Sequence, residues 1–202
     1  MYHQIISNKD TNQHFHITEP GKHIYLCLNY SGTLQFYLEK EGAEVYVFGI
    51  YVGNKSKQFE VKTTQHHQVP KTTSHVFFKG VFFDLSKFVY KGYIQIEKNA
   101  QKSFAYQKNQ NLLLSNDAIA ISQPDLEICA DDVHATHGST TGKLSDDELW
   151  YVYSRGFSVA QAHRVLIQGF LKEVEDMYLS QLGESMAQRE KVMLEKIYNL
   201  AV

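Results

Sequence analysis

Short stretches of alternating apolar and polar residues dominate the chain between about residues 21 and 144. The alternation is clearest at residues 34–38, 45–47 and 126–130. A period of two residues is typical of β-strands that bury one face. Turn residues such as Gly42 and Gly80 separate the stretches, so the pattern predicts many short strands joined by turns.

The turns recur with a loose similarity along this part of the chain. Residues 41–45, 98–102 and 116–120 each contain small or polar turn residues and lead into alternating residues. A weak repeat of this kind suits stacked rungs. A β-sandwich, a cupin-like barrel and a parallel β-helix all produce the same local alternation, and periodicity alone does not choose among them.

After Leu144 the pattern becomes helical. Ser145 and Glu148 have the spacing of a capping box, which predicts a helix ending near Arg155, with Gly156 in the left-handed position beyond it. Ser158 is placed to cap a second helix, and a third is predicted over about Glu184–Leu200. The second helix has an apolar stripe formed by Val159, Ala162, Leu166, Phe170, Val174 and Met177. We therefore predict a β body over residues 1–144 and a helical unit over residues 145–202.

Composition and charge exclude several classes of partner. The chain has 202 residues and a formal net charge of −2, and its lysines are scattered among acids, so nucleic acid is not an expected partner. The longest apolar run, Val45–Val52, is far shorter than the roughly 20 residues of a membrane span, so no membrane partner is expected. The first ten residues lack the features of a secretory signal, and the expected location is the cytoplasm.

The two cysteines, Cys27 and Cys129, cannot form a disulfide scaffold or a CxxC pair. Cys27 lies in an apolar stretch and is expected in the core. Cys129 has the parity of Glu127 and is expected to face outward, as a small strand residue or as a reactive thiol. The sequence contains no GxxxxGK[ST] loop, so the chain is not expected to bind ATP itself.

Several linked segments resemble one protein family. The segments Tyr90-x-Gly92-x-Ile94, Ala100–Gln107, Asn109–Ser115 and Asp125–Gly156 follow one another in the order found in the SufB/SufD family of iron-sulfur cluster assembly scaffold proteins. The resemblance implies a right-handed parallel β-helix with a C-terminal helical unit, and a non-catalytic scaffold that works with the ABC-type ATPase SufC. Typical family members are considerably longer.

His137 is the main candidate site residue. Its segment, Thr136-His137-Gly138, resembles SufD rather than the Glu-His-Glu-Ala-Thr segment usual in SufB. In SufD-type members this histidine lies at the interface with SufB and helps to hold the nascent cluster, which implies a cluster, interface or metal-binding role for His137. The alternative is an interface or turn histidine bonded to the backbone. Many SufD-type members have a cysteine two positions earlier, where this chain has Ala135.

Cys129 and His134 are further candidates for the cluster or interface. Iron-sulfur clusters are usually held by four thiolates, so a cluster here would be transient, shared with a partner or held by other ligands. Eight extended residues separate Cys129 from His137, about 26 Å, so both reach one iron only if the chain turns, for example at Asp131-Asp132. A spacing of three places His134 and His137 on opposite faces of a strand.

The expected partners also follow from the resemblance. Family members dock SufC through their C-terminal helices, which makes Arg155, Gly156 and Phe157 candidate contacts. The alternative is that the apolar stripe only packs on the β body. The second scaffold chain would be a SufB-like protein or another copy of this chain.

Two other functions stay open from the sequence. One is an interaction module without any cluster role, favoured by Ala135 and the low number of cysteines. The other is a cupin-like metal-dependent enzyme. Its metal ligands would come from His66 or His67, His75, Asp131, Asp132 and His137.

Overall fold

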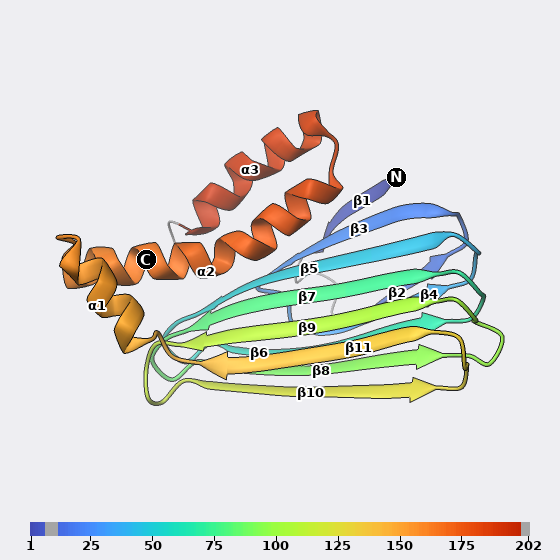
Figure 1. Ribbon diagram of the computed structural model, residues 1–202, viewed down its shortest axis with the longest axis horizontal. Coiled ribbons are helices and arrows are strands. Elements are labelled where there is room, and N and C mark those ends of the chain that lie inside the picture. The colour runs from blue at the N-terminus through green and yellow to red at the C-terminus, as the bar shows by residue number, and fades with distance from the viewer. Residues whose placement is uncertain (7–11, 199–202) are drawn as a thin grey trace.

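The computed structural model describes residues 1–6 and 12–198, with the backbone alone for 192, 193 and 195–198. Within these residues the strands form two sheets (Figure 1). Sheet A contains β1 (Tyr2–Ile6), β3 (Gly21–Leu28), β5 (Ala43–Gly53), β7 (Thr73–Phe82), β9 (Phe104–Leu113) and β11 (His134–Gly142), in that order. Sheet B contains β2 (Asn12–Ile17), β4 (Gly32–Leu38), β6 (Gln58–His67), β8 (Lys87–Ile96) and β10 (Ile119–Ile128).

All neighbouring strands are parallel, and the chain alternates between the two sheets. One strand of sheet B and the following strand of sheet A make one rung, and successive rungs stack. The fold is therefore a parallel β-helix with a C-terminal helical region, as predicted. The sandwich and the cupin-like barrel that the local pattern left open are wrong.

The corners keep the rungs in register. Gly21, Gly42, Lys71 and Lys102 occupy one column of corners, with φ angles of 96°, 81°, 55° and 59°. The amide of Gly21 donates to the Gly42 carbonyl (2.8 Å), and the amide of Gly42 donates to the Lys71 carbonyl (3.1 Å). Because these hydrogen bonds fix the register between rungs, the same alternate strand positions face the interior in every rung.

Large aromatic side chains fill the interior of the middle rungs. Phe36, Tyr51, Phe78, Phe88 and Tyr90 are completely buried. The rings of Tyr51 and Phe88 lie 4.7 Å apart between centroids, and those of Phe78 and Tyr90 lie 5.1 Å apart. Such contacts add to the stabilisation from burial alone. Cys27 also lies in this core, as predicted, and burial raises the pKa of its thiol.

Three helices follow the strands: α1 (Asp146–Ser154), α2 (Val159–Gln181) and α3 (Glu184–Tyr198). Helix α2 crosses the outer face of sheet A, with α3 beside it, and α1 lies beyond the strand ends at the left of Figure 1. Helix and sheet share one hydrophobic core, whose main members are Leu26, Phe48, Phe77, Val81, Ile167, Leu171, Val174 and Tyr178. The division into two domains at residue 144 stays a prediction. Position 200, the predicted helix end, lies outside the described residues.

The helix caps agree with the sequence in one case and not in the other. The Ser158 side chain accepts a hydrogen bond from the Gln161 amide, and the Gln161 side chain accepts one from the Ser158 amide, which completes a capping box. Gly156 has a φ of 88°, as predicted. Ser145 stands at the N-cap of α1, but its side chain makes no capping bond, so the predicted box is wrong.

The buried stripe of α2 is also rotated from the prediction. Val159 and Met177 are exposed, whereas Ile167 and Tyr178 are buried against sheet A. The outward side chains of the sheet determine which face of the helix is covered. Within the described residues, none of the helices is both long and apolar enough to cross a membrane.

A buried lysine anchors α2 to the sheet. The Lys79 side chain on β7 is 3% exposed and forms an ion pair with Glu173 of α2. Its ammonium group also donates to the Phe170 carbonyl (2.7 Å) and lies 4.2 Å from the centroid of the Phe170 ring. Burial lowers the pKa of Lys79, and the Glu173 carboxylate opposes this shift. The anchor therefore sets one position of α2 on sheet A.

Candidate functional site

The last rung, β10 with β11, is the open end of the β-helix. Strand β10 pairs with β8, and β11 pairs with β9, while the outer edge of each has no strand partner among the described residues. The two strands form the lower edge of the molecule in Figure 1. Unpaired backbone N–H and C=O groups along a strand edge favour pairing with another strand.

The apolar side chains of this rung lack the cover that equivalent side chains have elsewhere. Leu126 and Ile128 are in register with Ile94 and Ile96, which are fully buried. Leu126 is nevertheless 37% exposed and Ile128 is 41% exposed. They continue the column of inward side chains formed by Ile94 and Ile96, but no further rung among the described residues covers them. Exposed apolar groups beside an open strand edge are typical of a protein interface.

The sheet A side of the last rung is polar. His137, Ser139 and Thr141 follow Gln107, Asn109 and Asn111 in register, on the inward face of the strands. The three amide residues are buried, and the side-chain amide of Asn111 donates to Asn109 (2.7 Å). The interior therefore changes from aromatic to polar toward the open end. His137 is exposed at the end of this polar row.

His134 lies on the other face of β11. It is in register with the outward residue Phe104, and the two rings lie 6.1 Å apart between centroids. His137 is in register with the inward residue Gln107. The predicted separation of the two histidines is confirmed.

Cys129 lies outside the strand that carries the two histidines. It is exposed just beyond the end of β10, where its amide donates to the Ile96 carbonyl (2.9 Å). The chain turns at residues 129–133 and enters sheet A, and His137 lies about 10 Å along β11 from its first residue. In the described part of the chain, no group of three or more His, Cys, Asp or Glu side chains is arranged to hold a metal ion.

The two strands of the last rung offer different edges. Pro124 lies in the middle of β10 and is in register with Gly92. A proline has no N–H, so it interrupts the donors along a strand edge. Strand β11, which contains His137, has no proline between His134 and Gly142. This difference favours β11 as the edge that another strand would extend.

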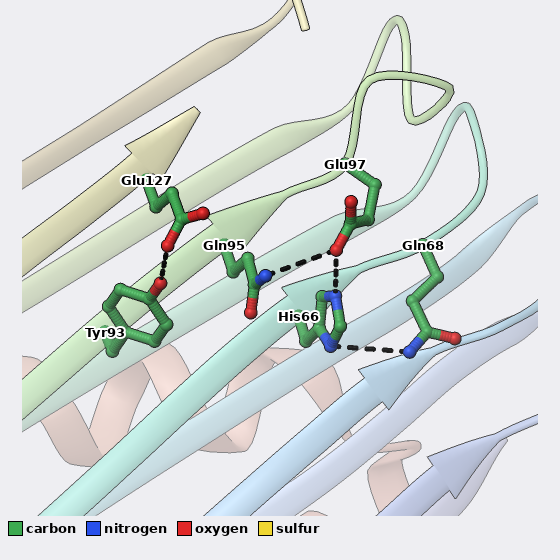
Figure 2. Close-up of polar contacts among 6 residues, drawn as sticks. All are labelled: His66, Gln68, Tyr93, Gln95, Glu97 and Glu127. Atoms are coloured by element: carbon green, nitrogen blue, oxygen red, sulfur yellow. Dashed lines mark hydrogen bonds and ion pairs between the residues drawn. The ribbon is translucent and has the colours of Figure 1, made fainter. Parts of the chain in front are cut away.

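The histidines of the cupin-like alternative point in different directions. His66 lies on the outer face of sheet B, where its Nε2 lies 2.8 Å from Glu97 and Gln68 contacts its Nδ1 (Figure 2). His67 faces the interior and bonds Thr72 and Ser74, each at 2.7 Å. Burial, with a smaller contribution from His66, lowers the pKa of His67 to about 3.

His75 lies on sheet A, where its ring stacks on Tyr46 with centroids 5.1 Å apart. His66 and His75 thus lie on different sheets, and His137 is on the inward face of the last rung. Asp131 and Asp132 are exposed in the turn before β11. The metal site proposed from these residues is therefore not assembled, and that interpretation is wrong.

A second exposed surface lies around α1 and the start of α2. We call it the α1–α2 apolar patch, formed by Trp150, Tyr151, Phe157, Val159 and Val165, all exposed. None of the nine residues Asp146–Ser154 is buried, and α1 extends beyond the strands in Figure 1. Arg155 lies over the Tyr151 ring, 5.2 Å from its centroid. The candidate residues Arg155, Gly156 and Phe157 form the exposed connection between α1 and α2.

Sequence comparisons identify the family of the chain. Residues 29–170, well over half of the chain, match the profile of the SUF system FeS cluster assembly, SufBD core domain. The chain belongs to the SufB/SufD family. It is 28% identical to the iron-sulfur cluster assembly protein SufD of Escherichia coli over 139 residues, which cover 69% of this chain and 33% of that protein.

Other members of the SufB/SufD family show similar relationships. SufD of Bacillus subtilis is 35% identical over 124 residues, covering 61% of this chain and 28% of that protein. An iron-sulfur cluster assembly SufBD family protein of Mycobacterium leprae is 28% identical over 183 residues, covering 86% of this chain and 45% of that protein. The chain thus spans less than half the length of these curated relatives.

Reasoning from the sequence missed the polar interior below His137. Gln107, Asn109 and Asn111 alternate at strand positions that would normally hold apolar core residues. The alternation of these polar residues in the sequence was the available signal. Their inward orientation became clear only from the register of β7, β9 and β11.

Proposed function

We propose that this SufB/SufD family member is a SufD-like, non-catalytic scaffold subunit for iron-sulfur cluster assembly. One observation carries the proposal: the last rung has unpaired edges, exposed core-column side chains and an inward histidine, all at the same end. The named roles of the E. coli and B. subtilis relatives support it. The partner at this end would be a SufB-like chain or a second copy of this chain.

In the proposed pairing, a partner strand extends β11 and covers the open end. The partner would bury Leu126 and Ile128, which are half exposed in the isolated chain. His137 would then lie inside the interface rather than on the surface. This arrangement uses main-chain hydrogen bonds for affinity and inward side chains for selectivity.

The cluster is cargo shared between the two chains in this proposal. Cys27 is fully buried in the hydrophobic core and unsuitable as a ligand, and Cys129 faces solvent at the far end of β10. His137 is the residue that this chain would contribute at the interface. Because clusters generally need four ligands, the others would come from the partner or from exogenous thiols.

The α1–α2 apolar patch is the proposed docking site for the SufC ATPase. Its aromatic side chains are exposed on a helix that has no buried residue between Asp146 and Ser154. Exposed aromatic residues with a neighbouring arginine, here Arg155, are typical of binding hot spots. The buried face of α2 packs on sheet A, and the patch lies outside that contact.

The cluster role is tested by His137→Ala, with His134→Ala as the matched control on the opposite face of the same strand. Each variant would be purified with the SufB-like and SufC proteins of the same organism and reconstituted anaerobically with iron and sulfide. We expect visible cluster absorbance in the wild type and His134→Ala, and at least a several-fold slower increase in His137→Ala. Equal rates in all three complexes would contradict the cluster role.

The docking role is tested by Trp150→Asp and Phe157→Asp, with Tyr2→Asp as the control. Tyr2 is also an exposed aromatic residue, but it begins β1, near the N-terminus and on the opposite side of the molecule from α1 in Figure 1. We expect SufC affinity to fall at least about tenfold in the patch variants, as at interface hot spots, and to be retained in the control. Retention of SufC by both patch variants would exclude this surface.

A docking module without a cluster role is the second candidate. Ala135 favours it, because a thiolate on the inward row would strengthen metal binding there and alanine offers none. This alternative expects a stable complex whose cluster formation is indifferent to His137. The His137→Ala experiment therefore separates the two candidates.

A further inference from the structure

Two glutamines cross the interior beneath the last rung. Gln65 of β6 and Gln107 of β9 are 0% and 1% exposed, and the Gln65 amide nitrogen lies 3.4 Å from the Gln107 carbonyl oxygen, to which it donates. In the described structure, the Gln107 nitrogen Nε2 and the Gln65 oxygen Oε1 have no hydrogen-bond partner. Unpaired buried amide groups are unfavourable, so a pair of them at one place requires an explanation.

A glycine on the opposite sheet holds the Gln107 amide in place. A Cβ atom added at Gly92 of β8 would lie 2.2 Å from both Nε2 and Oε1 of Gln107. No larger residue at position 92 would leave room for this amide. The side chain therefore spans the interior from sheet A to sheet B and rests on the backbone of β8.

The unpaired end of the amide has one polar neighbour in register. The Gln107 oxygen is turned toward Gln65 on β6, so the nitrogen points away from that strand. On the other side, the in-register inward residues are His137, next to Gln107, and Pro124, next to Gly92. The proline ring cannot form a hydrogen bond, which leaves His137 in register; the inward Ser122 hydroxyl, two positions before Pro124, is also buried and has no hydrogen-bond partner within the described structure.

We infer that Gln107 is a positioning residue for His137, acting when a partner covers the open end. A half-turn of both amides replaces the present hydrogen bond, from the Gln65 nitrogen to the Gln107 oxygen, by one from the Gln107 nitrogen to the Gln65 oxygen. The Gln65 nitrogen then loses its acceptor, and the Gln107 oxygen becomes free to accept another hydrogen. The Gln107 carbonyl oxygen then faces His137 and accepts the hydrogen of one imidazole nitrogen. The two ends of an amide have nearly the same shape, so the half-turns need no additional space.

This hydrogen bond would determine the tautomer of His137. With one ring nitrogen donating to Gln107, the other keeps its lone pair and is available to iron. Histidines that bind metals generally donate their second ring N–H to a carbonyl or carboxylate, and loss of that partner typically weakens binding 10–100-fold, roughly. The inference rests on the proposed function, because it concerns the same histidine.

The main test is Gln107→Met in the complex with the SufB-like and SufC proteins. Methionine has a similar length without the amide; it removes the unpaired Gln107 donor and also the acceptor of the Gln65 amide, so Gln65→Met, which breaks the same hydrogen bond, is the control for stability. We expect cluster formation to slow about tenfold or more, and the double variant with His137→Ala to be no slower than His137→Ala alone. A merely structural role would slow cluster formation equally in Gln107→Met and Gln65→Met, whereas a positioning role slows it mainly in Gln107→Met.

Gln107→Glu is the second variant, because it keeps an acceptor for the imidazole hydrogen. The inward residues around position 137 on β9, β10 and β11 carry no titratable group: Ala105, Gln107, Asn109, Ser122, Pro124, Leu126, Ala135 and Ser139. The new carboxylate would stabilise the protonated imidazole. We therefore expect cluster formation to be restored relative to Gln107→Met, with the midpoint of its pH profile moved upward.

The outcomes separate this inference from the proposed function. Slow cluster formation in His137→Ala together with a wild-type rate in Gln107→Met overturns the positioning role and leaves the scaffold role intact. A wild-type rate in His137→Ala overturns both. If Gln107→Met does not fold, Gln107→Glu decides, and an unchanged pH profile in that variant overturns the positioning role.

Discussion

In β8, Ile94 and Ile96 are completely buried, whereas Leu126 and Ile128, their register partners in β10, are half exposed. The two strands have the same length and run in the same direction within one sheet. Their difference lies in what covers them: among the described residues, β8 has a neighbouring strand on each side and β10 has one on a single side. The last rung therefore has the geometry of a core layer and the exposure of a surface.

The same comparison holds for the residues of sheet A. The inward row contains Tyr25, Val47 and Val76 in the first and middle rungs, continues with Gln107 and ends with His137. A polar row of this kind is unfavourable in an isolated core but suitable where a partner supplies hydrogen bonds. The middle rungs have a buried apolar interior, and the last rung has an exposed interior face that is polar on sheet A.

The largest expected difference between the two regions comes from truncation of apolar side chains. Phe78→Ala in the middle rungs should lower the free energy of unfolding by about 3–5 kcal/mol, because it leaves a cavity in a fully buried site. Leu126→Ala in the last rung should lower it by about 1 kcal/mol, because that side chain is already half exposed. Urea unfolding of the two variants measures both values, and equal losses would contradict the comparison.

The next effect is a pH dependence that originates in the middle rungs. The pKa of buried His67 is about 3, against its usual 6.5, so between these values the unfolded chain binds a proton that the folded chain does not. Its contribution to stability is complete above about pH 6.5 and decreases as the pH falls toward 3, by at most about 1.4 kcal/mol per unit.

His67→Gln should remove this part of the slope. Urea unfolding of the wild type and the variant between about pH 7 and pH 4 gives the difference, since other groups contribute equally to both. Parallel curves for the two proteins would show that His67 is not the source.

A smaller effect compares two glycines. Gly92→Ala should lower the free energy of unfolding by about 1–3 kcal/mol, because its Cβ would overlap the Gln107 amide. Gly138→Ala in β11 meets no atom within 4 Å and should change it by less than about 0.5 kcal/mol. Thermal melting of both variants tests this. A larger loss for Gly138→Ala would mean that the last rung is as tightly packed as the middle ones.

The smallest effect on stability is expected for Ala135→Cys, at most about 0.5 kcal/mol, because the site is only partly covered. This thiol would lie on the inward row beside His137, and the complex with partner subunits should retain more iron after gel filtration. Ala105→Cys, one rung deeper and fully buried, is the matched control and should retain no more than the wild type. Equal iron retention by both cysteine variants would contradict the expectation that iron reaches the thiol at position 135 and not the buried thiol at position 105.

The strand positions of the fold were largely predictable because alternation reports directly which residues face inward. Residues 34–38 alternate in the sequence, and Leu34, Phe36 and Leu38 are completely buried. The stacking into a β-helix was not encoded in that local signal and came from the resemblance to the SufB/SufD family. Local helix chemistry was predictive at Ser158, where the cap depends on residues three positions apart.

Features that depend on distant contacts were not predictable. The buried face of α2 includes Ile167 and Tyr178 because sheet A presents Phe48 and Phe77 to them, which no helical period reveals. The opposite orientation of His134 and His137 followed from strand geometry alone. The contact of Gln107 with Gly92 requires β8 and β9, which belong to different sheets, to face each other across the interior, so neither residue signals it separately.

The ion pair between Lys79 and Glu173 gives α2 a fixed point of attachment on sheet A. This point lies near the middle of the helix. About 20 Å of helix extends from Glu173 to Val159, beyond which α1 is attached. A tilt of about 10° around this pivot would displace that end of α2 by roughly 4 Å. Glu173 also pairs with Lys108 of β9, so a force applied to α1 would reach two strands of sheet A, β7 and β9, and β9 is the direct neighbour of β11.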